Sequence, residues 1–271
     1  MHTFTVMRTS TVFAATTLCL ATIVSACLDG VSDPAEAEQG AGGNKLGGIF
    51  HRDVQDKYVG VVLVQTGDDD YQQICTGTII SDRHVLTAAH CAMNDMDVTI
   101  KVVGNGHMVL LRGTIEPHPE YDANARTPND IAIVTLAPDY QTDKIKAFFA
   151  SNKIGLADAT SIPKSNWTTV GFDIPNAWGN TPPERRYGDM ETEWCLLHLN
   201  ETFCFEDDDG GVIFGAGDSG APILMNPQSG GPQVVGAVAI RISSVAFSLW
   251  RTVHAIDILP YRAWIDAQLA R

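Results

Sequence analysis

The chain has 271 residues, of which 45% are hydrophobic and 18% are charged, and this composition excludes an intrinsically disordered protein. Its formal net charge of -14 excludes nucleic acid as a partner, because phosphate binding needs a basic surface. A chain of this length can form one large domain or two small ones.

The first 26 residues are expected to be a secretory signal peptide. Arg8 is followed by an apolar stretch of small residues with no charge before Asp29, too short and too Thr-rich for a membrane span. The sequence VSAC, which ends at Cys27, resembles a bacterial lipoprotein box, in which the cysteine carries lipid and becomes the mature N-terminus. The alternative is ordinary cleavage nearby, with Cys27 an incidental thiol. We therefore expect an exported protein, either a bacterial outer-membrane lipoprotein or a secreted, extracellular one.

Residues 27–45 are rich in glycine, alanine and acidic side chains. Such a segment is expected to be a flexible tether or a pro-segment rather than part of the fold. The remaining residues, 46–271, are expected to form the functional domain.

Cysteine usage agrees with export. Cys19 would leave with the signal peptide and Cys27 would carry lipid, so that four cysteines remain in a chain that permits disulfides. Four cysteines allow three pairings, and the spacing alone does not choose among them. None of the spacings is a CxxC, so a zinc site is not expected.

The mature part consists of short apolar or β-branched runs separated by turn clusters, which predicts an all-β sandwich or barrel. Helical spacing of apolar residues appears only in 257–270. The expected strands are 58–66, 74–80, 84–89, 97–103, 107–115, 130–136, 167–172, 221–225, 233–240 and 247–253.

Three residues of complementary chemistry lie far apart in the chain. His90 ends the apolar run VLTAAHC, Asp130 opens DIAIVTL, and Ser219 lies in FGAGDSGAP. A serine hydroxyl is a weak nucleophile until a base takes its proton, and neutral histidine can do this near pH 7. A buried carboxylate is costly unless it is hydrogen-bonded, and a histidine N–H is a suitable partner.

The glycines beside Ser219 are expected to shape its turn. Gly217 and Gly220 permit unusual backbone angles. A turn of this kind can direct the amide N–H groups of Gly217 and Ser219 to one point, forming an oxyanion hole for a tetrahedral intermediate.

TAAHC, HPEY followed by NDIAIVTL, and GDSGAP, in this order, resemble the trypsin/chymotrypsin-like serine proteases. WTTVGF and FSLWRTVHAIDILPYRAWI also resemble parts of that family, and the resemblance covers roughly residues 46–271. It implies a fold of two six-stranded antiparallel β-barrels with a C-terminal helix and an active site in the cleft between the barrels.

The resemblance also implies a role for each of these residues. His90 is the general base and then the acid, Asp130 orients it, and Ser219 is the nucleophile of a serine endopeptidase that acts on protein or peptide substrates. The disulfides implied are Cys75–Cys91 and Cys195–Cys204. The chemistry requires no cofactor, and the sequence contains no cofactor motif.

Specificity and activation depart from the usual family pattern. By the same resemblance, Ile213 would occupy the pocket base, where an acidic residue would select Lys or Arg, and the pocket-lining strand would contain Ala239 and Arg241. The expected preference is for apolar residues, although Arg241 could instead lean in and close the pocket or favour an acidic side chain, and a loop shift could bring one of the acids 207–209 to the pocket base.

The family often requires cleavage that frees an N-terminus to pair with the acid before the nucleophile, here Asp218. In KLGGIF the cut would expose Leu46 or, alternatively, Ile49. Two other functions stay open at this point: a non-catalytic, protease-like binding lipoprotein and an esterase-type serine hydrolase.

Overall fold

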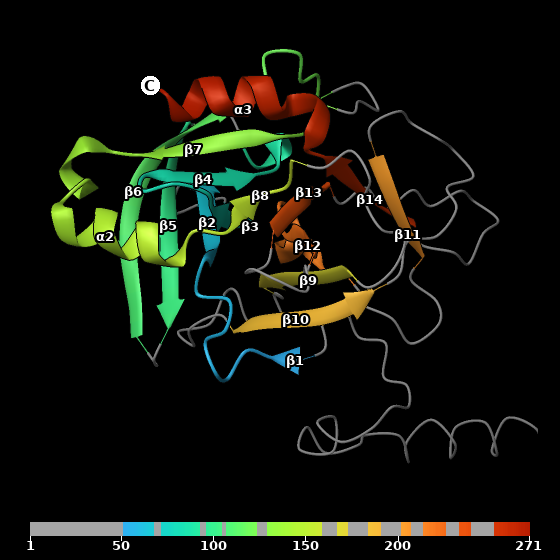
Figure 1. Cartoon of the computed structure of the whole chain (residues 1–271), viewed down its shortest axis with the longest axis horizontal. Helices are drawn as coiled ribbons and strands as arrows, with labels where there is room; N and C mark the ends of the chain where they lie inside the picture. The colour runs from blue at the N-terminus through green and yellow to red at the C-terminus, as the bar shows by residue number, and fades with distance from the viewer. Residues whose placement is uncertain are drawn as a thin grey trace, which may run out of the picture. The chain divides into compact units, whose positions relative to one another are not determined.

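In the computed structural model of the chain, shown in Figure 1, all the described residues belong to the unit Lys45–Arg271. None of the helices in this described part is long and apolar enough to cross a membrane. The described residues are 51–67, 72–92, 96–104, 107–123, 129–158, 167–172, 184–190, 202–206, 214–225, 233–239 and 252–271.

A closed antiparallel barrel forms the first half of the fold and confirms the all-β prediction. The strands pair in the order β2-β3-β4-β7-β6-β5, and β5 closes the barrel by pairing with β2. The six strands are β2 (Val61–Gly67), β3 (Gln72–Ile79), β4 (His84–Thr87), β5 (Asp97–Gly104), β6 (His107–Pro117) and β7 (Ala132–Leu136).

Strand β2 shows why these sequences form strands although they do not alternate between apolar and polar residues. Side chains of a strand point to its two faces in turn. Val62 and Val64 pack in the cluster inside the barrel. Val61 and Leu63 pack in a second cluster, which also contains Val170 of the second sheet. Both faces of β2 are therefore buried, and a continuous apolar run is the result.

The second half is a sheet of eight strands. Seven pair in the order β1-β10-β9-β12-β13-β14-β11, and β8 runs parallel to β13. Together with the closed barrel, this second sheet agrees with the expected two-barrel fold, although in the described chain it has eight strands and not the expected six. They are β1 (His51–Arg52), β8 (Gly155–Leu156), β9 (Trp167–Phe172), β10 (Arg185–Met190), β11 (Thr202–Glu206), β12 (Pro222–Met225), β13 (Gln233–Ala239) and β14 (Thr252–Asp257).

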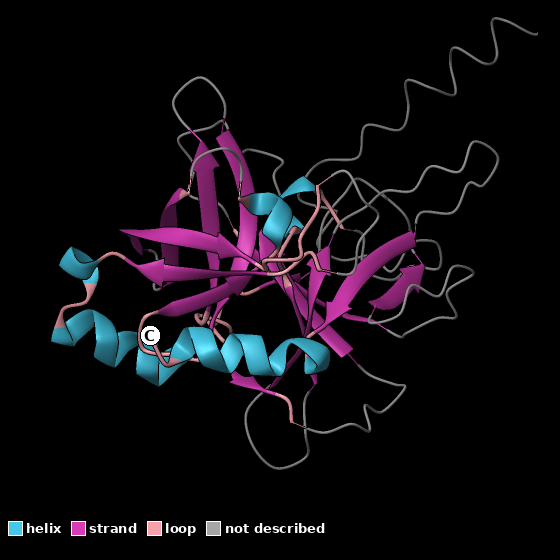
Figure 2. Cartoon of the chain, turned by 90° about the horizontal axis from the view of Figure 1, so that it is seen from above, coloured by secondary structure: helices cyan, strands magenta, loops and turns pink. Residues whose placement is uncertain are grey.

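The described chain contains two α-helices, which are among the helices coloured cyan in Figure 2. Helix α3 (Arg262–Leu269) confirms the predicted C-terminal helix. The expectation that only the C-terminus is helical is wrong, because α2 (Asp143–Asn152) is also an α-helix. The Thr142 side chain caps α2 by accepting the Ile145 N–H at 3.4 Å. Of the residues of α2, only Phe149 is buried, so the sequence has little of the periodic pattern that marks a helix.

A buried ion-pair network joins the segment that follows β1 to β10 and β5. Arg185 is 4% exposed, and its Nε and Nη2 atoms lie 2.7 Å from Asp53 and 2.9 Å from Asp56. Its Nη1 donates to the Val103 carbonyl at 2.7 Å. Asp53 also accepts the Lys57 and Tyr58 amides. Because each charge has partners, the network avoids the cost of isolated buried ions.

His84 predicts a dependence of stability on pH. It is 1% exposed, and its Nδ1 lies 2.7 Å from the Ser81 hydroxyl, which already accepts the His84 amide. Burial is the main cause that lowers the pKa of His84 from 6.5 to about 4, and neighbouring Arg83 adds to it. The folded protein therefore keeps His84 neutral, while the unfolded chain binds a proton below about pH 6.5.

The free energy of unfolding should accordingly fall by about 3 kcal/mol as the pH decreases from 6.5 to about 4. Urea unfolding across this interval measures the slope. His84→Gln, which does not titrate, should be less stable at neutral pH but should lose this part of the slope. An identical slope in wild type and variant would show that other groups cause it.

Candidate active site

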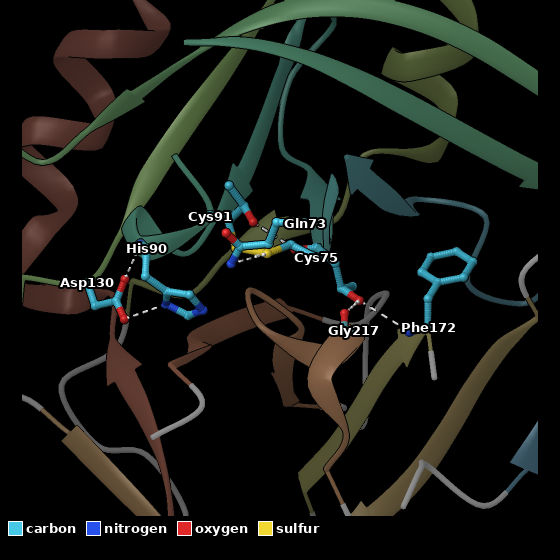
Figure 3. Close-up of a disulfide and its surroundings, with 9 residues drawn as sticks. Gln73, Cys75, His90, Cys91, Asp130, Phe172 and Gly217 are labelled. Atoms are coloured by element: carbon cyan, nitrogen blue, oxygen red, sulfur yellow. Dashed lines mark hydrogen bonds and ion pairs between the residues drawn. A yellow bond between two sulfur atoms is a disulfide. The ribbon is translucent and has the colours of Figure 1, made fainter. Parts of the chain in front are cut away.

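His90 and Asp130 make a two-point contact, drawn in Figure 3. The carboxylate Oδ2 lies 2.7 Å from His90 Nδ1, and Oδ1 accepts the His90 backbone N–H at 2.8 Å. A carboxylate oxygen accepts hydrogen bonds, so this contact suits the histidine tautomer with its proton on Nδ1 and its lone pair on Nε2. The Asp130 side chain is 9% exposed and that of His90 is 24% exposed, so Asp130 is shielded while the His90 ring can be reached.

Asp130 lies in a tight turn, and the residue before it, Asn129, is hydrogen-bonded to other segments of the chain. The Ile131 N–H donates to the Asn129 carbonyl at 2.9 Å, which closes the turn around Asp130. The Asn129 side chain donates to the Glu120 carbonyl at 3.1 Å and accepts the Tyr261 hydroxyl at 3.0 Å. Tyr261 ends η5 (Leu259–Tyr261), so the C-terminal segment supports the residue before Asp130.

Ser219 follows the short helix η4 (Ala216–Asp218) and is 5% exposed. The Ala221 N–H donates to the Asp218 carbonyl at 2.9 Å and continues the turn. The Asp218 side chain is fully buried and accepts the Gly215 N–H at 2.8 Å. The nucleophile candidate thus lies in a compact turn with its own internal hydrogen bonds.

Two neighbouring residues of β3 connect the histidine and serine segments. Cys75 forms a disulfide with Cys91, the last residue of η2 (Ala89–Cys91), which also contains His90. Thr76 donates its N–H to the Ser219 carbonyl at 2.7 Å. The Cys75–Cys91 pairing implied by the family resemblance is therefore present.

Gly220 shows the unusual backbone angle that was expected of it. Its φ is +82°, and a Cβ at this position would collide with the Thr76 carbonyl oxygen and the Thr87 hydroxyl. Gly217, whose lack of a side chain would also permit such an angle, does not adopt it: within the described chain, only Gly67 and Gly220 among the glycines have positive φ. Gly217 instead lies inside η4, whose helical geometry needs no left-handed residue.

One group of possible metal ligands occurs among the described residues. A ring nitrogen of His90 and the sulfurs of Cys75 and Cys91 lie within 4.8 Å of one another. Both sulfurs belong to the disulfide, so they are not thiolate ligands. The group therefore reports how close the His90 ring lies to the disulfide.

Only some of the residues expected at the site lie among the residues that the structure describes. Ala239 lies in β13, and Cys204 lies in β11 opposite His254. The predicted Cys195–Cys204 bridge therefore stays a prediction. Outside the described residues lie Cys27, Leu46, Ile49, Cys195, Ile213 and Arg241.

Sequence reasoning missed Thr76, Asn129 and Tyr261. Each supports the site through a hydrogen bond to a residue that is remote in the sequence, up to 141 positions away for Thr76 and Gly217. No local pattern marks such a contact. Asn129 had the nearest signal, because it directly precedes Asp130.

Gly220→Ala should damage both the fold and the serine turn. Left-handed strain costs about 1–2 kcal/mol and overpacking about 1–3 kcal/mol, so we expect a loss of about 2–5 kcal/mol in the free energy of unfolding. Urea unfolding measures it. Gly104→Ala is the control, since a Cβ there would meet no atom closer than 3.5 Å. Equal stability of the two variants would contradict the role assigned to Gly220.

Comparison with known proteins gives the same family throughout. The family described as Trypsin matches residues 47–265. The trypsin of Saccharopolyspora erythraea is 29% identical over 195 residues, covering 64% of this chain and 78% of that protein. Chymotrypsin-C of Rattus norvegicus is 25% identical over 231 residues, covering 77% and 83%.

A solved structure, the scabies mite inactivated protease paralogue S-I1, has a similar fold with a TM-score of 0.62 and 19% identity. It covers 83% of this chain and 99% of its own. At this identity the likeness concerns the fold alone. With the family match extending over most of its length, the chain belongs to the trypsin family of serine proteases.

Proposed function

We propose that the chain is a catalytically active serine endopeptidase whose triad is His90, Asp130 and Ser219. The observation that carries the proposal is the pairing of both Asp130 oxygens with His90, 2.7 Å at Nδ1 and 2.8 Å at the amide. It fixes the ring and leaves the other ring nitrogen as the base. The link from Thr76 to the Ser219 carbonyl supports the nucleophile's place beside that base.

In the proposed reaction, His90 Nε2 takes the Ser219 hydroxyl proton while the oxygen attacks the substrate carbonyl carbon. The amides of Gly217 and Ser219 stabilise the resulting oxyanion, with an effect of about 10² to 10³ in rate for each donor. His90 then gives its proton to the leaving amine as the C–N bond breaks. Water, activated by the same histidine, hydrolyses the acyl-enzyme and restores the Ser219 hydroxyl.

A fluorophosphonate probe tests the triad, because its phosphorus is attacked by an activated serine and fluoride leaves. Ser219→Ala should abolish labelling, and Asp130→Asn should reduce the labelling rate about 10⁴-fold, since the amide would favour the wrong histidine tautomer. Ser151→Ala, which changes an exposed serine of α2, is the control and should label like wild type.

Failure of every wild-type form to label, whether begun at Cys27, Leu46 or Ile49, would contradict catalysis and favour the non-catalytic binding lipoprotein. Casein and a simple ester, tested side by side, separate a protease from an esterase.

We propose that cleavage of casein occurs after apolar residues, with Ile213, Ala239 and Arg241 lining the pocket. Fragments that end in Lys or Arg would contradict this preference.

We further propose activation by cleavage, with the new amino group of Leu46 pairing with Asp218. The support is the complete burial of the Asp218 side chain within the serine turn. A charge-assisted hydrogen bond of this kind contributes about 1.5–3 kcal/mol, so a chain begun at Leu46 should label at least about tenfold faster than one begun at Cys27. Asp218→Asn should remove the difference.

A chain begun at Ile49 tests the alternative cut in the same assay. Equal labelling of all three chains would contradict activation by cleavage.

We propose export as well, with residues 1–26 as the signal peptide, Cys27 as the lipidated residue and 27–45 as the tether. The support within the structure is the Cys75–Cys91 disulfide, because such bonds persist in oxidising compartments. Mass spectrometry of the mature N-terminus tests the proposal, and an unmodified Cys27 would contradict lipidation.

A further inference from the structure

The side-chain hydroxyl of Thr76 is a buried connection between the two halves of the fold. Thr76 lies in β3 of the barrel and is 0% exposed. Its hydroxyl donates to the Gly217 carbonyl at 2.8 Å and accepts the Phe172 N–H at 3.2 Å. Gly217 belongs to the serine turn and Phe172 ends β9, and both are labelled close together in Figure 3.

The backbone of Thr76 holds the same turn at a second point. Its N–H donates to the Ser219 carbonyl at 2.7 Å, and its own carbonyl accepts the Thr87 hydroxyl at 2.8 Å. All the polar groups of Thr76 are therefore hydrogen-bonded, and two of them bind carbonyls of the serine turn. Such complete pairing is what a fully buried polar residue requires.

The two carbonyls belong to the residues whose amides are proposed to bind the oxyanion. Gly217 has no side chain to limit its φ and ψ, so its orientation depends on the contacts that its backbone makes. When the Gly217 and Ser219 carbonyls are fixed toward Thr76, the conformations of both residues are restricted, and with them the directions of their N–H groups. Oxyanion donors act through such preorganisation.

We infer that Thr76 is a positioning residue for the oxyanion hole and that its hydroxyl, not its bulk, carries the effect. The inference rests on the proposed function, because it assigns a second support to the same catalytic turn. Serine can make the same two hydrogen bonds. Valine has the shape of threonine but leaves the Gly217 carbonyl and the Phe172 N–H without this partner.

The same strand contains a matched control. Thr78 lies two residues further along β3, on the same face, and is 1% exposed. Its hydroxyl has no hydrogen-bond partner among the described residues. Thr78→Val therefore makes the same chemical change in the same strand without removing a hydrogen bond to the serine turn.

The experiment measures hydrolysis of p-nitrophenyl acetate and fluorophosphonate labelling by the chain begun at Leu46, at a temperature well below the unfolding midpoint of each variant. Thr76→Val should reduce kcat and the labelling rate about 10- to 100-fold, less than the loss of a whole oxyanion donor, with KM changed less than about twofold. Thr76→Ser should recover wild-type rates within about threefold. Thr78→Val should match wild type.

Any of three results in an active wild type would overturn the inference. The first is a Thr76→Val chain as fast as the Thr78→Val chain. The second is equal damage in Thr76→Val and Thr76→Ser, and the third is a rise in KM alone; either of these two would mean that Thr76 only fills space.

Amide hydrogen exchange keeps the inference testable if the wild-type chain proves inactive and the proposed function fails. Faster exchange at Gly217 in Thr76→Val, but not in Thr76→Ser, would support positioning of the turn. Unchanged exchange at Gly217 would overturn it.

Discussion

The pleat of strand β3 is the constraint on which the site depends. Successive side chains of a strand point to opposite faces. The Cys75 side chain therefore points into the barrel cluster, where its disulfide holds the segment that contains His90. The side chain of the next residue, Thr76, points the other way and contacts the turn that contains Ser219. Because the two attachments are on adjacent residues, the segments that contain His90 and Ser219 are both tied to one short length of β3.

Asp130 is held by a different part of the molecule. It follows Asn129, whose side-chain oxygen accepts a hydrogen bond from the Tyr261 hydroxyl of the C-terminal segment. The Tyr261 ring also packs against His118, at a centroid distance of 5.2 Å, and the His118 N–H donates to the Ile131 carbonyl on the other side of Asp130. The last residues of the chain thus help to set the geometry of a turn in the first barrel. Removing Tyr261 would therefore take away a support of the Asp130 turn while leaving His90, Asp130 and Ser219 in the chain.

The sequence predicted those features that depend on local patterns. Apolar runs marked the barrel strands, and three motifs marked His90, Asp130 and Ser219. Strand β10 was missed because RRYGDM contains two arginines and an aspartate, although Arg185 is buried through its ion pairs. The sequence allowed unusual backbone angles at both Gly217 and Gly220, and only Gly220 has a positive φ, since composition alone does not say which glycine of a turn is left-handed. The contacts of Thr76 and Tyr261 cross more than 130 residues and leave no local pattern.

The Arg185 network has a consequence for the chain ahead of it. In strand β1, His51 pairs with Tyr187, and Asp53, the residue that follows the strand, forms an ion pair with Arg185. These contacts limit how far the chain ahead of His51 can extend. A new amino terminus made at Leu46 would be five residues from His51 and could travel no more than about 18 Å from it, since an extended chain spans at most about 3.6 Å per residue. The reach of a freed end is therefore set by where the chain is anchored, whichever protease makes the cut.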